Sequence, residues 1–104
     1  MGLIIKSTEA KSINSIDLDG VNVELEQVYA RIECAFRPNG TTIEAAFPYI
    51  FKSKSAFNNG AQSLSHNIAK TSTIGEVVGQ TLLSAHELCA AELVNLGYSV
   101  DIDL

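Results

Sequence analysis

Residues 28–52 read VYARIECAFRPNGTTIEAAFPYIFK, and this stretch decides the fold. Along residues 28–36 apolar side chains alternate with the others, which is typical of a strand with one buried face. Arg37-Pro38-Asn39-Gly40 follows, and proline together with Asn-Gly favours a tight turn. The alternation resumes over residues 43–52. The stretch therefore predicts a long β-hairpin.

The alternation also predicts how the two arms pair. If paired residue numbers sum to 79, one face of the hairpin carries only apolar side chains, and a slip by one residue would exchange the faces. The pairs expected on that face are Phe36 with Ile43, Cys34 with Ala45, Ile32 with Phe47, Ala30 with Tyr49, and Val28 with Phe51. Pro48 has no N–H to donate, so its arm is expected at a sheet edge or with that position facing solvent.

The next segment predicts a second hairpin. Residues 53–57 lead into Asn59-Gly60, a hairpin turn signal, and an alternating run from Leu64 to Ile68 follows it. We expect a three-stranded meander over residues 28–70. Its polar stretch, residues 53–67, is expected to form an arm that is mobile or ordered by a partner.

Shorter strands are predicted at both ends of the chain. At the N-terminal end they are expected over residues 3–5, 13–18 and 21–25, with a turn at residues 17–20. At the C-terminal end, residues 98–104 alternate between apolar and polar side chains and predict a final strand.

A long helix is predicted over residues 73–96. Thr73 and Glu76 have the spacing of a capping box, and Gly97 is expected to close the helix. One stripe is expected to pack on the sheet, namely Ile74, Val77, Val78, Thr81, Leu82, Ala85, Leu88, Cys89 and Leu96. Leu83, Ala90 and Val94 fall on the other side of the helix, where a monomer would be polar, and this second apolar face indicates a partner.

Glu92 falls at the centre of that predicted core stripe. A buried carboxylate would need a partner such as Arg31, Arg37 or a lysine of another chain. The alternative is a last helical turn that is bent or frayed and exposes the side chain.

Together these elements predict an α+β fold in a single domain, residues 1–104. An antiparallel sheet or small β-sandwich carries the long hairpin, one C-terminal helix packs on it, and a final strand follows. The 104 residues, of which 46% are hydrophobic, are enough to build one core and too apolar for a disordered chain.

The net charge of −5 is unevenly distributed. Residues 1–27 carry two lysines and five acids, residues 28–70 carry five cations and two acids, and residues 71–104 carry five acids and no cation. A basic middle between acidic ends can serve contacts between copies of the chain, although chance in a small acidic protein is an equal alternative.

Composition argues against several classes of ligand. A net acidic chain without a clustered basic face is not expected to bind nucleic acid specifically. The chain has no apolar run near the ~18 residues that cross a bilayer, so no membrane partner is expected. Cys34 and Cys89 lie in apolar surroundings without ligand spacing, and we expect small buried side chains in a reducing compartment rather than a disulfide.

The remaining candidates for chemistry are weak. His66 and His86 lack an acid or cysteine at triad or ligand spacing and are expected to be solvated or packing residues. Asp101 and Asp103 share a strand face and could hold a cation, but a solvated face is the preferred interpretation. We therefore expect no catalytic, cofactor-binding or metal site and no enzymatic activity.

The order of a long hairpin over residues 28–52, a helix and a final strand resembles the small subunits of bacteriophage virions, of the tail-tube, neck or decoration type. The resemblance lies in element order. It implies a β-sandwich with a flanking helix, repeated in rings whose subunits extend a hairpin onto the neighbour. The matching positions are the turn 37–40 and the arm 53–67.

The function expected is a non-enzymatic, self-assembling structural protein of a virion, assembled in the host cytoplasm. Its partners would be copies of itself and other structural proteins. The alternative is a small oligomeric, cytoplasmic binding module that recognises a peptide or small ligand at a sheet edge. The interface residues predicted are Arg37, Pro38, Asn39, Gly40, Lys52, Lys54, Leu83, Ala90, Glu92 and Val94.

Overall fold

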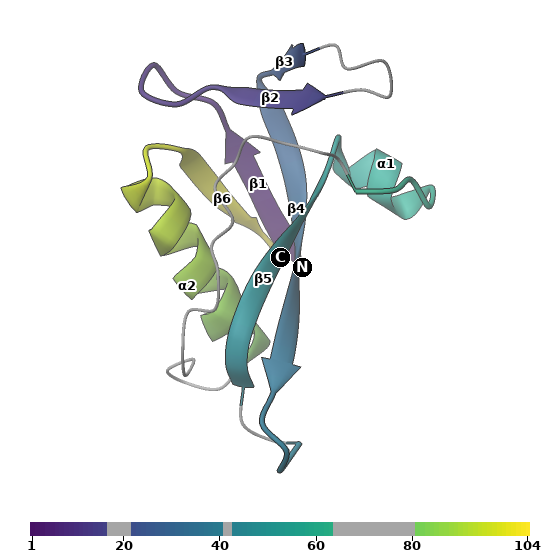
Figure 1. Cartoon of the computed structure of the whole chain (residues 1–104), viewed down its shortest axis with the longest axis vertical. Helices are drawn as coiled ribbons and strands as arrows, with labels where there is room; N and C mark the ends of the chain where they lie inside the picture. The colour runs from purple at the N-terminus through teal and green to yellow at the C-terminus, as the bar shows by residue number, and fades with distance from the viewer. Residues whose placement is uncertain (17–21, 41–42, 64–80) are drawn as a thin grey trace.

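The computed structural model describes residues 1–16, 22–40, 43–63 and 81–104 (Figure 1). The α+β fold is confirmed, with antiparallel sheets, one main C-terminal helix and a final strand. The elements are β1 (Gly2–Lys6), β2 (Ile13–Ile16), β3 (Asn22–Leu25), β4 (Gln27–Phe36), β5 (Ile43–Phe51), α1 (Lys54–Asn58), α2 (Leu82–Asn95) and β6 (Ser99–Asp103).

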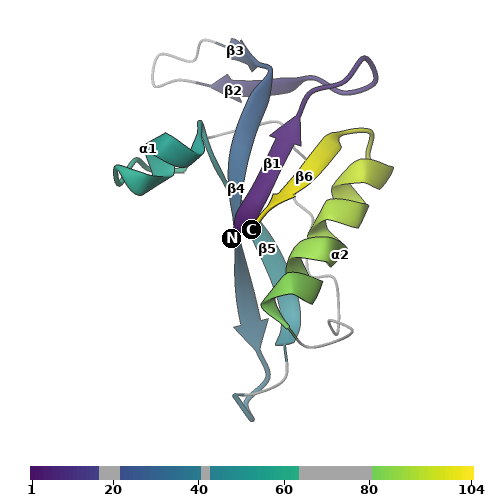
Figure 2. The ribbon, with the colours of Figure 1, turned by 180° about the vertical axis from the view of Figure 1, so that it is seen from behind.

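The main sheet has four antiparallel strands in the order β5-β4-β1-β6. Gly2 pairs with Asp103, so the two chain ends lie side by side (Figures 1 and 2). The two-stranded β2–β3 sheet lies across one end of the main sheet, and the tip of the β4–β5 hairpin lies at the opposite end (Figure 1). Of the two predicted arrangements, the described residues form a sheet covered by a helix rather than a sandwich.

The predicted hairpin is confirmed, but its register is wrong over most of its length. From Tyr29 opposite Phe51 to Ala35 opposite Ala45, paired residue numbers sum to 80 instead of 79. Only Phe36 opposite Ile43 is paired as predicted. The register shifts between Ala35 and Phe36, where Glu44 is an extra residue on β5. This β-bulge moves every later pair by one position, which no alternation rule anticipates.

The shift divides the apolar side chains of β5 between the two faces of the sheet. Ala46 and Ile50 lie with Cys34 and Ala30 on the face that packs against α2. Phe47, Tyr49 and Phe51 lie on the opposite face, which we call the open face. Pro48 lies in β5, which is an edge strand, as its missing N–H predicted.

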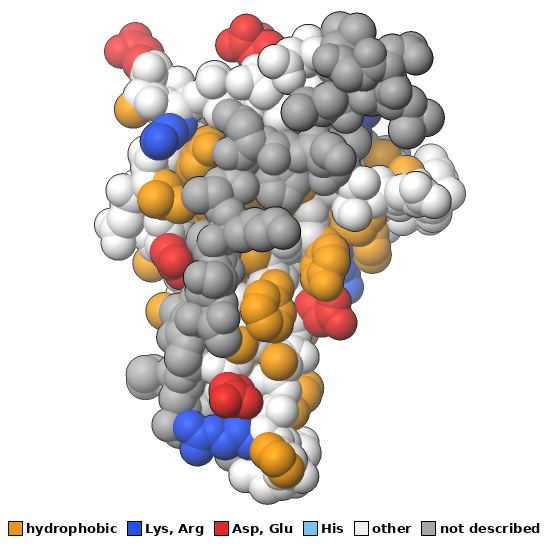
Figure 3. Space-filling view, in the orientation of Figure 1, with side chains coloured by type: hydrophobic (Ala, Val, Ile, Leu, Met, Phe, Trp, Pro, Cys, Tyr) orange, Lys and Arg blue, Asp and Glu red, His pale blue; other side chains and the backbone are white. Residues whose placement is uncertain are grey.

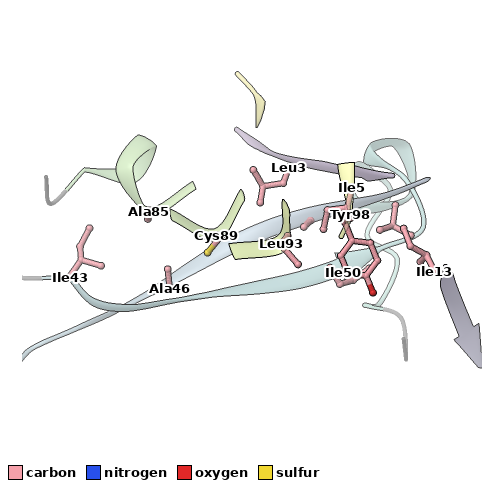
Figure 4. Packing of buried hydrophobic residues seen from close by; sticks show 12 residues of the cluster. Leu3, Ile5, Ile13, Ile43, Ala46, Ile50, Ala85, Cys89, Leu93 and Tyr98 are labelled. Atoms are coloured by element: carbon pink, nitrogen blue, oxygen red, sulfur yellow. The ribbon is translucent and has the colours of Figure 1, made fainter. Parts of the chain in front are cut away.

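The core lies between the main sheet and α2, with a contribution from β2 (Figure 4). Each strand of the main sheet contributes side chains from one face only, as alternation requires. The buried cluster comprises Leu3, Ile5, Ile13, Val28, Ala30, Ile43, Ala46, Ile50, Ala85, Cys89, Leu93 and Tyr98. Val100 and Ile102 of β6 pack against this cluster, in agreement with the predicted alternation of the final strand.

A cap at Thr73 would make Ile74 the first helical residue. Helix α2 begins eight residues later, at Leu82. Thr81 has an extended backbone and is the N-cap: its side chain accepts a hydrogen bond from the Ser84 N–H, and the Ser84 hydroxyl accepts one from the Thr81 N–H. The reciprocal pair satisfies two N–H groups at the helix start. The predicted cap at residues 73–76 lies outside the described residues. Gly97, with φ +108°, follows the last turn as predicted.

The buried face of α2 differs in part from the predicted stripe. Its buried residues are Ala85, His86, Cys89 and Leu93. Leu82, expected in the core, is 52% exposed in the first turn, whereas Ala90, expected on the outer side, packs against the core cluster. Glu92 was expected at the centre of the helix face that packs on the sheet, but it is half-buried at the edge of that face. The fully buried Cys89 and Leu93 lie at the centre. Leu83 and Val94 are exposed as predicted.

The predicted second hairpin is wrong over its described part. Residues 54–58 form the short helix α1, because the Ser53 hydroxyl caps it by accepting a hydrogen bond from the Ala56 N–H. Gly60, with φ +80°, follows this helix instead of turning a hairpin. The strand expected at residues 64–68 lies outside the described residues.

Candidate functional site

The open face of the main sheet lies opposite α2. Arg31 and Tyr49 are cross-strand partners there, as are Glu33 and Phe47. Figure 1 shows α2 on one side of the sheet and α1 on the other. The larger and charged side chains assigned to the open face by strand register are Ile4, Lys6, Tyr29, Arg31, Glu33, Phe47, Tyr49, Phe51, Asp101 and Asp103.

Helix α1 covers one part of the open face through Phe57. The Phe57 ring lies 4.9 Å from the ring of Phe51 and 6.0 Å from that of Tyr29, centre to centre. The Arg31 guanidinium lies 4.8 Å from the centre of the same ring, within the range of a cation–π contact. Tyr29 is only 2% exposed. Phe57 therefore holds the short helix α1 on the sheet, whereas we predicted an arm over residues 53–67 that is mobile or ordered by a partner. Residues 64–67 of that arm lie outside the described residues.

Two ion pairs involve strand β6: one joins it to α1 and the other joins it to β1. The Lys54 ammonium lies 2.7 Å from an Asp103 carboxylate oxygen, and the Lys6 ammonium lies 3.4 Å from Asp101. The lysine beside Asp103 lowers the pKa of that carboxyl and has its own pKa raised. Asp101 and Asp103 thus each lie beside a lysine.

The Lys54–Asp103 pair makes the attachment of α1 dependent on pH. The pKa of Asp103 in the folded chain lies below its usual value of 3.8, so the pair stabilises the fold above that pH and loses this effect as pH falls through the folded pKa. At neutral pH, Asp103→Asn should lower the melting temperature, and at a pH below the folded pKa of Asp103, where both side chains are neutral, the two proteins should melt alike. An equal difference at both pH values would contradict this role of the pair.

The rest of the open face is not covered by α1. Tyr49 is 47% exposed and Phe47 is half-buried, and both lie on the part of β5 that leads to the hairpin tip. Figure 3 shows hydrophobic side chains at the surface between α1 and the tip. Beyond them Phe36 is 54% exposed. Tyr49 and Phe47 thus remain at least partly at the surface on the open face, whereas Phe36, which pairs with Ile43, is exposed on the other side of the hairpin.

Both cysteine thiols are free. Cys89 is buried against the sheet, and this burial, together with the charge of Glu92, raises the pKa of its thiol to about 12. Burial also raises the pKa of the half-buried Cys34 thiol, with a smaller effect from Glu33. Neither environment favours the thiolate that nucleophilic chemistry needs.

Thiol labelling tests this description. In a Cys34→Ser variant at about pH 8, the remaining Cys89 should not react with Ellman's reagent until the protein is unfolded, because the reactive thiolate is absent. One equivalent should then react in denaturant. Rapid labelling of the native variant would show that Cys89 is not buried as described. The matched Cys89→Ser variant reports the slower but measurable reaction of Cys34.

His86 is a packing residue. It is 1% exposed, and its Nδ1 lies 2.7 Å from the Leu82 carbonyl, to which it donates a hydrogen bond. Among the described residues, no group of three or more His, Cys, Asp or Glu side chains is arranged to hold a metal ion. His66 lies outside the described residues.

The predicted interface residues do not form one surface. The turn residues Arg37, Pro38, Asn39 and Gly40 are exposed at the hairpin tip, where the Gly40 N–H donates to the Arg37 carbonyl at 2.8 Å. Lys52 is exposed after β5, and Lys54 belongs to α1. The four predicted residues of α2 divide into exposed Leu83 and Val94 and half-buried Ala90 and Glu92.

The sequence interpretation missed the open face as a candidate surface. One signal could have indicated it. Glu44 is the only charged residue in β5, and from Ala45 to Phe51 both sets of alternate residues, which point to opposite faces of the sheet, are apolar. A strand that is apolar at both parities is covered on both faces in the assembled protein. In this chain α2 covers one face of β5, and α1 covers only part of the other.

No helix in the described part of the chain is long and apolar enough to cross a membrane. Comparisons with protein-family models, with curated proteins and with solved structures found no match to this chain.

Proposed function

We propose that this protein is a non-enzymatic structural subunit that assembles with copies of itself, of the type found in bacteriophage virions. It would assemble in the host cytoplasm and contact other structural proteins in the particle. The open face of β5 carries the proposal. Tyr49 is 47% exposed there, and exposed apolar surface beside charged side chains is typical of protein–protein contacts.

The hairpin adds a second line of support. β4 and β5 extend toward one end of the 43 Å long axis, and the turn 37–40 is exposed at that end (Figure 2). Phe36 at the base of this turn is 54% exposed. In the virion subunits that the chain resembles in element order, a hairpin is extended onto the neighbouring subunit, and this hairpin has the shape and the exposed apolar residue for such a contact.

Negative-stain microscopy with light scattering on the purified protein tests the proposal. The expected result is a population of rings, tubes or closed oligomers whose mass is a multiple of 11.1 kDa. Association should weaken with added salt, since oppositely charged segments of the chain would contribute to the contacts. A monomer at all salt and protein concentrations would overturn the proposal.

A binding module remains the second candidate function, because of the sheet edges. In the described part of the chain, β5 and β6 form the two edges and neither has a strand on its outer side. An added strand could pair there and raise the melting temperature. Pro48 leaves β5 without one N–H, so the β6 edge is the better site for such a peptide. Strand-forming peptides that leave the melting temperature unchanged would remove this candidate.

A further inference from the structure

Helix α1 is attached to the open face by side chains at its surface. The ring of Phe57 packs on the rings of Phe51 and Tyr29, and the Lys54 ammonium pairs with the Asp103 carboxylate. None of the five residues of α1 is buried. Helix α2, in contrast, is held on the other face by four buried residues. The two helices are therefore attached to the sheet with very different strength.

The backbone of the α1 segment holds itself together rather than binding the sheet. The Phe57 N–H donates to the Ser53 carbonyl, and the Ala61 N–H donates to the Ala56 carbonyl. The backbone hydrogen bonds that the described residues show for 53–61 all run within this segment. A helix of five residues is too short to be stable in water by itself. The fold of α1 thus depends on the packing of Phe57 and on the ion pair of Lys54.

The rings beneath α1 continue into the uncovered part of the open face. Tyr29 is 2% exposed and Phe51 is half-buried, whereas Phe47 and Tyr49 lie on the same face beyond the reach of α1. Figure 1 shows α1 beside the end of the hairpin that lies away from its tip. If α1 detaches, the four rings form one aromatic surface along β4 and β5.

We propose that α1 is a lid, which detaches from the open face while the main sheet and α2 stay folded, and which uncovers Tyr29 and Phe51 when it opens. Local opening of this kind is expected where few apolar side chains are buried and the backbone hydrogen bonds are exposed. The lid sets how much aromatic surface a single chain presents. The inference goes beyond the proposed self-assembly and does not depend on it.

Hydrogen exchange of the wild-type chain, followed by mass spectrometry, tests whether α1 opens separately. The amides of residues 53–61 should be less protected than those of α2. Low concentrations of urea should leave their exchange almost unchanged, since detaching a short segment exposes little surface. Exchange in α2 should accelerate with urea, because it requires unfolding of the core. The same protection and urea dependence in both segments would show that α1 opens only when the whole chain unfolds, and would overturn the proposal.

Phe57→Ala removes the ring that holds the lid. Exchange over residues 53–61 should become at least about tenfold faster, because apolar burial and the aromatic contacts are lost, while exchange in α2 stays unchanged. Ser55→Ala is the matched control, since Ser55 is an exposed residue of the same helix. Its exchange should equal that of the wild type or be slower, because alanine favours the helix.

Two results with Phe57→Ala would contradict the lid. Exchange over residues 53–61 that matches the wild type would show that α1 frays while Phe57 stays docked. Equal acceleration in α2 would show that Phe57 supports the whole fold rather than the attachment of α1. Both measurements are made on dilute protein and report on the single chain, so their outcome is independent of whether copies assemble.

Discussion

Leu93→Ala is expected to destabilise the protein by about 2–5 kcal/mol, which is a large part of the stability of a domain of this size. Leu93 is fully buried at the centre of the α2 face that packs on the sheet (Figure 4). Removing three carbons there loses apolar burial and leaves a cavity, because the strands beneath the helix are held by backbone hydrogen bonds and cannot close the gap. Helix propensity favours alanine slightly and does not offset this loss.

Urea unfolding followed by circular dichroism measures the effect, with Val94→Ala as the control. Val94 is the next residue of the same helix and is 51% exposed, so its truncation should change the free energy of unfolding by less than about 0.5 kcal/mol. Equal effects at the two positions would show that α2 does not pack on the sheet through Leu93.

Gly2→Val should destabilise the protein by about 1–3 kcal/mol or more. A Cβ atom at Gly2 would lie 2.4 Å from the Tyr29 hydroxyl oxygen and 2.7 Å from the Ala30 carbonyl oxygen. The Tyr29 ring is buried under Phe57, and the carbonyl belongs to the backbone of β4. Neither group can move aside without disrupting the ring packing or the strand pairing. We expect part of β1 to separate from its neighbours, with the loss of α1 packing as well.

Gly60→Ala is the comparison for this prediction. A Cβ atom there would meet nothing within 4 Å, and only the backbone strain at φ +80° opposes it. Its cost should be about 1 kcal/mol. A melting temperature lowered more by Gly60→Ala than by Gly2→Val would contradict the close packing of β1 against Tyr29.

The strands and the helix end were predictable from local patterns. Strand β1 is a short apolar run, the β4–β5 hairpin and β6 show alternation, and Gly97 ends α2 because only the residue without a side chain adopts φ +108° easily. The helix start was not predictable, because Thr73 and Glu76 match the usual capping-box spacing, whereas Thr81 was expected in the core stripe. The structure uses Thr81, where Ser84 completes the reciprocal hydrogen bonds.

The β4–β5 register could not be predicted by alternation alone. β5 is apolar at both parities, so either register gives an apolar face, and the choice depends on the bulge at Glu44. This single residue moved Tyr49 from the predicted core to the surface. For the same reason the open face was not predicted as an interface. The predicted interface residues were chosen from the hairpin turn, from charged residues and from the helical wheel. For α2 that wheel located Leu83 and Val94 but misplaced Ala90, because Leu93 rather than Glu92 marks the core side.

Sedimentation velocity of the wild-type chain over a wide range of concentration tests the proposed self-assembly most directly. Species whose masses are multiples of 11.1 kDa are expected, growing with concentration and shrinking as salt screens contacts between oppositely charged segments of neighbouring copies. A single species of 11.1 kDa at every concentration and salt would contradict it.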